Sequence, residues 1–272
     1  MSGYSWIRRL LRRFGVDVVR YSGRRFPEKI PFELIRDHDV SLVLDVGASV
    51  GQTAVDLRAQ GYRGRIVSFE PQREAFRALA RAADNDDAWE CRNVAIGDRR
   101  SNVQVNISRN SWSSSLLPMS ERHRQAAPAS VYADSEDVQL LRLDDLRAEF
   151  VRKDDRLYLK LDVQGYEAQA IAGAAETLSQ AVVVEAEVSL VELYEGQTLM
   201  SDFVNLMRDH NFLPLHLAPE FRDPATGELL QLNVWFARKS DVDTAVNGSV
   251  VSTRAAPDRR SRKWFKAVSR HS

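Results

Sequence analysis

The chain has 272 residues, of which 44% are hydrophobic and 28% charged, and its 38 basic side chains balance 38 acidic ones. One large α/β domain fits this length better than two small ones. The single cysteine excludes a disulfide framework and a cysteine zinc cluster. No apolar stretch is long enough to cross a bilayer and the first residues lack a signal-peptide pattern, so we expect a cytoplasmic protein.

The net charge of zero is the sum of two basic ends and an acidic middle. Residues 1–25 hold seven arginines and one aspartate, and residues 251–272 hold seven basic side chains and one aspartate, so each end carries +6 and the middle −12. Trp6, Leu10 and Phe14 recur at helical spacing, which predicts a short basic amphipathic helix. Such ends could hold the protein on the inner face of an anionic membrane, or the helix could pack on the domain. We expect no nucleic-acid partner, because the acidic middle would repel phosphates.

Strand and helix signals alternate from about residue 41 to residue 215, as a doubly wound sheet requires. The predicted strands are residues 42–45, 66–69, 89–96, 102–108, 138–143, 156–163, 181–188, 212–217 and 231–238. Helices are predicted directly after Gly51 and over 73–83, 144–150, 165–179 and 199–210. Residues 110–137 lack periodicity, which predicts a long loop of the kind used as a lid or acceptor site.

The first predicted strand ends in Asp45 and runs into a turn with Gly47 and Gly51, and the second delivers Glu70 at its carboxyl end. This βαβ pattern indicates a ribose-bearing cofactor at the tips of adjacent parallel strands, although the glycines could simply end a strand and begin a helix. Ser49 stands where dinucleotide-binding motifs have their middle glycine. The pattern resembles class I S-adenosylmethionine-dependent methyltransferases, in which the acid binds the ribose hydroxyls and the turn packs against the amino-acid part of the cofactor.

A second polar segment follows the strand predicted over 156–163. Alternation places Lys160 and Asp162 on one face, with Asp162 at the carboxyl end beside the cofactor crevice. Asp162 could also cap the next helix, and the two roles can coexist. Lys160 could equally pair with a neighbouring carboxylate such as Glu187.

Over about residues 40–238 the chain resembles the FkbM family of methyltransferases. The resemblance is carried by six motifs in order: Asp45-Val46-Gly47-Ala48 with Gly51; Phe69-Glu70-Pro71; Asn93 to Asp98; Ser113 to Leu116; Lys160 to Glu167; and Glu187 before Leu193 to Gln197, with Thr226-Gly227, Gln231 and Phe236 to Arg238 closing the pattern. It implies a Rossmann-like, seven-stranded, mostly parallel sheet with an antiparallel last strand. It also implies S-adenosylmethionine as cofactor and O-methylation of a sugar, glycolipid or other natural product. Asn233 departs from the family, which commonly has aspartate there.

The motifs predict three groups of site residues. Cofactor contacts are expected from Asp45, Gly47, Ala48, Gly51, Gln52, Glu70, Asn93 and Val94, and substrate contacts from Ser115, Tyr194 and Asn233. We expect Asp162 to act as general base, with Glu187 and Lys160 orienting or tuning it. His123 is an alternative base, although a lone loop histidine is usually solvated. Asp162 and Glu187 could also supply oxygen ligands to magnesium, but two carboxylates do not define a metal site and no metal is assigned.

Two other functions are compatible with the residues. A nucleotide-dependent oxidoreductase would use a similar fold, but the missing middle glycine and the downstream motifs disfavour it. A non-catalytic module that binds cofactor or lipid would retain the glycine turn without supporting turnover. We divide the chain into a basic segment over 1–25, a methyltransferase domain over 26–240 and a flexible basic tail over 241–272.

Overall fold

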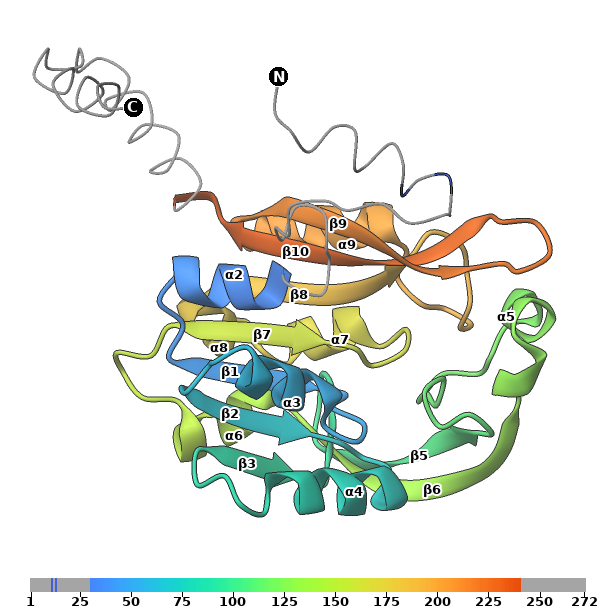
Figure 1. Ribbon diagram of the computed structural model, residues 1–272. Coiled ribbons are helices and arrows are strands. Elements are labelled where there is room, and N and C mark those ends of the chain that lie inside the picture. The colour runs from blue at the N-terminus through green and yellow to red at the C-terminus, as the bar shows by residue number, and fades with distance from the viewer. Residues whose placement is uncertain (1–10, 12, 14–29, 241–272) are drawn as a thin grey trace, which may run out of the picture.

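The computed structural model describes residues 30–240, together with Leu11 and Arg13. A seven-stranded sheet lies between two layers of helices, and a smaller three-stranded sheet extends from one side (Figure 1). Nearly all of the predicted basic helix and the whole tail lie outside the described residues, so their membrane contact stays a prediction. In the described part of the chain, no helix has the length and apolar character of a membrane span.

The large sheet has the predicted topology. Its spatial order is β3 (Trp89–Arg92), β2 (Arg65–Phe69), β1 (Leu42–Val46), β7 (Leu157–Leu161), β8 (Ala181–Ser189), β10 (Leu229–Arg238) and β9 (Phe212–Arg222). The strands from β3 to β8 are parallel, and β10 is antiparallel to both of its neighbours. The carboxyl ends of β1, β2 and β7 therefore meet at one edge of the sheet, where ligands bind in open α/β folds.

Helices cover both faces because the strands are apolar on both. On one face lie α2 (Ile30–Asp37), α3 (Gln52–Ala59) and α4 (Arg73–Ala83); on the other lie α6 (Leu143–Phe150), α7 (Glu167–Ala172), α8 (Ala175–Gln180) and α9 (Met200–Asp209). The predicted alternation in β7 is confirmed, since its leucines pack in one core and Tyr158 packs in the other.

The smaller sheet has the order β4 (Ala95–Ile96), β6 (Tyr132–Leu141), β5 (Ser101–Ser108). The expectation of one strand over 89–96 is therefore wrong. The chain leaves the large sheet at Asn93, whose side-chain amide donates to the backbone carbonyls of Glu70 and Pro71, and β4 pairs with β6 instead.

Two further expectations are corrected. Residues 110–137 are not one loop, because they contain α5 (Glu121–Ala126), a short 3₁₀ helix (Pro128–Ser130) and the first half of β6. That half of β6 is solvent-exposed and carries no hydrophobic pattern. The helix expected over 165–179 is divided into α7 and α8, because Gly173 lies against Gly97; a Cβ at Gly173 would come 1.9 Å from the Gly97 carbonyl oxygen.

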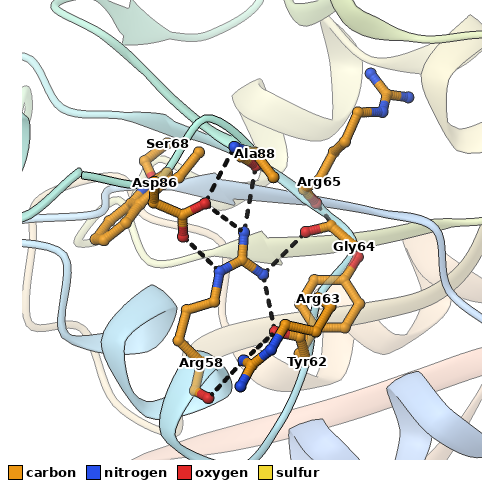
Figure 2. A network of polar contacts seen from close by, with 9 residues as sticks. Arg58, Tyr62, Arg63, Gly64, Arg65, Ser68, Asp86 and Ala88 are labelled. Atoms are coloured by element: carbon orange, nitrogen blue, oxygen red, sulfur yellow. Dashed lines mark hydrogen bonds and ion pairs between the residues drawn. The ribbon is translucent and has the colours of Figure 1, made fainter. Parts of the chain in front are cut away.

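At the opposite end of the sheet, Arg58 ties together the segments that precede β2 and β3 (Figure 2). Its guanidinium donates to the carboxylate of Asp86 at 2.6 Å and to the carbonyls of Tyr62, Gly64 and Ala88 at 3.1, 2.9 and 3.3 Å. One side chain thereby satisfies three loop carbonyls. The contacts at the amino ends of these strands are therefore structural. The candidate site lies at the opposite edge, at the carboxyl ends, as is usual in open α/β sheets.

The outer strand of the large sheet, β9, contains Pro214 and Pro219. It is paired only with β10 in the described residues, and the pairing shifts register at three points. Proline is tolerated in edge strands because no ladder hydrogen bond is needed on the free side.

Candidate active site

The turn after β1 is held open by left-handed backbone conformations. Gly47 has φ +82°, Ser49 φ +48° and Gly51 φ +92°. A Cβ on Gly47 would come 1.8 Å from the Asp162 carbonyl oxygen, so only glycine allows the ends of β1 and β7 to approach this closely. Gly51 faces inward instead, where a Cβ would meet Leu79 and Trp89 at 2.9 Å.

Glu70 lies at the end of β2 with 2% of its surface exposed. One carboxylate oxygen accepts a hydrogen bond from the Ser49 backbone N–H and the other from the Gln72 backbone N–H, both at 2.8 Å. Burial raises the pKa of Glu70 to about 7 despite these two hydrogen bonds. Each oxygen keeps a further lone pair for a ligand hydroxyl.

A cavity of about 630 Å³ opens at this edge of the sheet. We define its cofactor wall as Gly47, Ala48, Gln52, Glu70 and Val94, all of which line it and all of which the sequence predicted. The remaining predicted cofactor residues stand behind this wall: Gly51 packs against Trp89, Asn93 holds the Glu70 carbonyl, and Asp45 lies under Lys160.

The cofactor wall suits a nucleoside with a charged tail. Its carboxylate can accept ribose hydroxyls, Phe69 and Ile96 add apolar surface beside Val94, and the volume lies within the range of small-molecule sites. These residues fit S-adenosylmethionine, which would lie with its ribose at Glu70 and its tail at the turn around Gly47.

Lys160 lies between two carboxylates under the cavity floor. Its Nζ is 3.1 Å from Asp162 Oδ2 and 3.9 Å from Asp45 Oδ1. Burial alone would lower the pKa of Lys160, but the charges of Asp162, Asp45 and Glu185 raise it, so this ammonium stays protonated. Its ion pairs are thus with Asp162 and Asp45 and not with Glu187, the alternative partner, and its register partner in β8 is Glu185.

Four polar side chains gather where β7 and β8 end and the antiparallel β10 begins. Gln164 Nε2 donates to Asp162 Oδ1 at 2.9 Å and to Glu187 Oε2 at 2.6 Å, and Gln231 Nε2 donates to the same Glu187 oxygen at 3.1 Å. Burial and the charge of Asp162 raise the pKa of Glu187 well above its usual value. Two neighbouring carboxylates therefore share this end of the cavity. The raised pKa of Glu187 favours its protonated form, whereas Asp162 is paired with Lys160.

The rest of the cavity forms what we call the acceptor wall, which consists of residues 110–116 with His123, Glu187, Glu220, Gln231 and Asn233. The two residues of this wall that were predicted to contact substrate, Ser115 and Asn233, are hydrogen-bonded to other residues of the protein. Ser115 Oγ donates to the Gln164 carbonyl at 2.7 Å, and Asn233 Nδ2 donates to Glu220 at 2.9 Å. Tyr194 is fully buried beneath this wall and reaches it through its hydroxyl, which donates to Gln164 Oε1 at 2.6 Å.

His123 is buried rather than solvated, with 3% of its surface exposed. It lies in α5, its ring meets Tyr194 edge-on at 5.1 Å, and burial lowers its pKa to about 4. The imidazole is therefore neutral at physiological pH. By contrast, Trp112 at the cavity is 70% exposed.

Sequence reasoning did not assign Gln164, Glu220, Gln231 or Trp112 to the site. Gln164 had a usable signal, because it is a polar residue in the turn directly after Asp162. Glu220 had none, since it lies far along an exposed edge strand. Within residues 30–240, no three histidine, cysteine, aspartate or glutamate side chains are grouped as metal ligands would be.

Residues 45–214 match the family model described as the methyltransferase FkbM domain. The 2-O-methyltransferase NoeI of Sinorhizobium fredii (strain NBRC 101917 / NGR234) is 28% identical over 203 residues, which cover 71% of this chain and 79% of NoeI. Among solved structures, an rRNA methylase from Streptococcus thermophilus aligns with a TM-score of 0.44 and 10% identity, over 81% of this chain and 99% of the methylase. Fibrillarin from Aeropyrum pernix, solved with natively bound S-adenosyl-L-methionine, aligns with a TM-score of 0.41 and 11% identity, over 76% of this chain and 74% of fibrillarin. The family model spans more than half of the sequence, and the chain therefore belongs to the FkbM methyltransferases, which makes it an S-adenosylmethionine-dependent methyltransferase.

Proposed function

We propose that this methyltransferase methylates a hydroxyl group of a neutral, polyhydroxylated acceptor such as a sugar or the saccharide part of a glycolipid. The observation that carries the proposal is the carboxylate of Asp162, which lines the cavity where the cofactor wall and the acceptor wall meet. A hydroxyl is a poor nucleophile, and a carboxylate within hydrogen-bond reach can take its proton as the new bond forms. The relative NoeI is named as a 2-O-methyltransferase, which supports oxygen as the target atom.

The chemistry of the acceptor wall supports a neutral acceptor. Amides, serine hydroxyls and carboxylates face the cavity, and Lys160 is the one lysine or arginine among the described residues that line it. That lysine is already held by Asp162 and Asp45. A phosphate or carboxylate on the acceptor would meet Glu187 and Glu220, and the described lining residues offer no free cation to balance it. Hydroxyl groups, by contrast, can both donate to carboxylates and accept from amides.

In this mechanism the bound cofactor supplies a methyl group on a positively charged sulfur. Glu70 would hold the ribose and the turn at Gly47 the amino-acid tail, in the same cavity that Asp162 lines. Asp162 accepts the proton of the acceptor hydroxyl, and the ion pair with Lys160 at 3.1 Å holds that carboxylate in place. Most of the rate gain comes from alignment, because the acceptor oxygen must lie in line with the bond that breaks.

The test is transfer of a labelled methyl group from S-adenosylmethionine to a panel of methyl glycosides and extracted glycolipids. Each neutral sugar is paired with its uronic acid or sugar phosphate, and Asp162→Asn protein is the control. We expect label in neutral acceptors, with a mass gain of one methylene and an alkali-stable methyl ether. Label confined to anionic acceptors or to nitrogen would contradict the proposal. Cofactor binding without any transfer would favour a non-catalytic module.

We also propose that the basic ends bring the enzyme to an anionic membrane carrying a glycolipid acceptor. The support is the sequence alone, +6 at each end against −12 between them. Each basic residue near an anionic surface contributes about 1 kcal/mol, which salt screens. Sedimentation with anionic and neutral vesicles, at low and high salt, should show salt-sensitive binding to the anionic ones. An undiminished preference after both ends are deleted would exclude this role.

A further inference from the structure

Gln164 connects several parts of the candidate site. Its side chain donates to Asp162 and Glu187, accepts from the Tyr194 hydroxyl, and its backbone carbonyl accepts from Ser115. These partners come from four separate segments of the chain. From this geometry we infer that Gln164 is a positioning residue, whose amide is fixed in one orientation by Tyr194 so that it holds the two carboxylates together.

The backbone at Gln164 supports a specific role. Its φ is +54°, a left-handed conformation that is uncommon outside glycine and costs free energy unless the surroundings impose it. The next residue, Gly165, has φ +97°, and a Cβ there would come 3.0 Å from the Tyr194 side chain. The glycine thus lets the Tyr194 ring lie directly against the turn, and the turn directs the Gln164 amide back over the end of β7.

Tyr194 determines which end of the amide faces the carboxylates. A hydroxyl that donates to Oε1 leaves both Nε2 protons directed at Asp162 and Glu187. The opposite orientation would place the amide oxygen against two acidic groups and would leave the Tyr194 hydroxyl to donate only to the Ser113 carbonyl, at 3.3 Å instead of 2.6 Å. Tyr194 is itself fixed, because its backbone N–H donates to Gln197 at 2.6 Å and its ring meets His123.

The bridge has an electrostatic consequence for proton removal. Besides each other, the two carboxylates face these titratable groups: Asp45, Glu70, Lys160, Glu167, Tyr194 and Glu220. All but Lys160 become negatively charged when ionised, and Tyr194 stays neutral because burial raises its pKa, so donors to the carboxylate pair matter. Hydrogen bonds from Nε2 favour the ionised form of both carboxylates. Removing them should disfavour negative charge at this site and move the onset of proton removal to higher pH.

The inference rests on the proposed O-methyl transfer, and its test combines kinetics with structure. The variants are Gln164→Met, which keeps side-chain length without donors, and Tyr194→Phe, which keeps the ring. Gln231→Met is the matched control, since it removes a donor from Glu187 but leaves the bridge to Asp162. We expect kcat to fall roughly 10- to 100-fold in the first two, with cofactor affinity within about twofold of wild type.

Two further readouts separate positioning from general loss of stability. The acid limb of the pH–rate profile should move to higher pH in Gln164→Met and move less in Gln231→Met. The double variant that combines Gln164→Met with Tyr194→Phe should have a kcat no lower than that of Gln164→Met alone, because Tyr194 acts through the Gln164 amide. Additive losses, or equal shifts in both glutamine variants, would overturn the inference.

A crystal structure of Tyr194→Phe provides the test that needs no acceptor. The Gln164 amide should leave at least one of the two carboxylates. If it keeps both contacts unchanged, Tyr194 does not orient it and the inference fails, whatever the acceptor proves to be. If the amide moves but wild-type enzyme transfers no methyl to any hydroxyl, the proposed function fails while the positioning role stands.

Discussion

The cofactor wall and the acceptor wall line the same cavity but are assembled in different ways. The cofactor wall uses a turn and two strand ends within residues 46–96, and its key contact joins Ser49 to Glu70. The acceptor wall combines a segment from the edge of the small sheet with residues of β8, β9 and β10, more than 70 positions further along the chain. Local geometry can be identified from a motif, whereas contacts between distant segments depend on the whole fold. Substitutions in the cofactor wall should therefore change cofactor affinity and stability. Substitutions in the acceptor wall should change the kinetic constants for the acceptor.

The largest expected effect lies where the walls meet. Asp162→Asn keeps the shape of the side chain but removes the base, so turnover should fall about 10²- to 10⁴-fold. Cofactor affinity, measured by calorimetry, should stay near the wild-type value. Near-normal turnover would indicate alignment alone or a different base, with Glu187 the first alternative because it shares the Gln164 bridge.

Gly47→Ala tests how closely the cofactor wall is tied to Asp162. The new Cβ would overlap the Asp162 carbonyl, whereas a Cβ at Gly61, which also has positive φ, would meet nothing within 4 Å. Gly61→Ala should cost about 1–2 kcal/mol of stability from backbone strain, and Gly47→Ala a further 1–3 kcal/mol. Urea unfolding measures both. Equal costs would show that the approach of β1 to β7 is not tight.

Glu70→Gln should separate function from stability. Loss of the charged acceptor should weaken cofactor binding by about 1–3 kcal/mol. Because the folded pKa of Glu70 is raised from 4.5 to about 7, its ionisation opposes folding, and wild-type stability is lost as pH rises through that window. Relative to wild type, the variant should gain up to about 3 kcal/mol of stability between pH 4 and pH 8. Its amide nitrogen replaces one of the two oxygens that accept backbone N–H groups, so the difference between the two pH values is the quantity that tests the pKa. Thermal unfolding at both values measures it. A stability difference that does not change with pH would contradict the assignment.

The smallest effect is expected at the rim of the acceptor wall. Trp112 is 70% exposed and can stack on a sugar ring. Trp112→Ala should raise KM for the acceptor by a few-fold, about 0.5–1.5 kcal/mol, with kcat and cofactor affinity unchanged. Steady-state kinetics with the best glycoside from the panel tests this. A change in cofactor affinity instead would mean that the two walls are not separable.

The sequence predicted the parts of the fold that depend on periodicity and local turns. The doubly wound character of the large sheet followed from alternating strands and helices, and the alternation in β7 showed its two faces directly. The break at Asn93 was not predictable, because it depends on an amide bonding to carbonyls over 20 residues away in sequence. The start of β6 carried no signal because its side chains there are exposed.

The same distinction applies to the candidate site. Glu70 and Asp162 were identifiable because each ends a strand of the parallel core. His123 was assigned to a solvated loop because nothing local shows that Tyr194 and Phe221 enclose it. Gln164 was passed over because its importance comes from partners 23 and 30 residues downstream. Sites assembled from distant segments need the fold before their members can be recognised.

The two prolines of β9 have a consequence for how the molecule behaves in concentrated solution. An edge strand is a template on which a second chain can add its own strand, which is a common start of aggregation. Pro214 and Pro219 each lack an amide hydrogen, and the three register shifts against β10 bend the row of backbone groups. The outer side of β9 therefore offers an interrupted set of donors to an incoming strand. Replacing Pro214 or Pro219 would restore an amide hydrogen to this edge strand and favour self-association through it, and Pro214 is the better choice because Pro219 adjoins Glu220 of the acceptor wall.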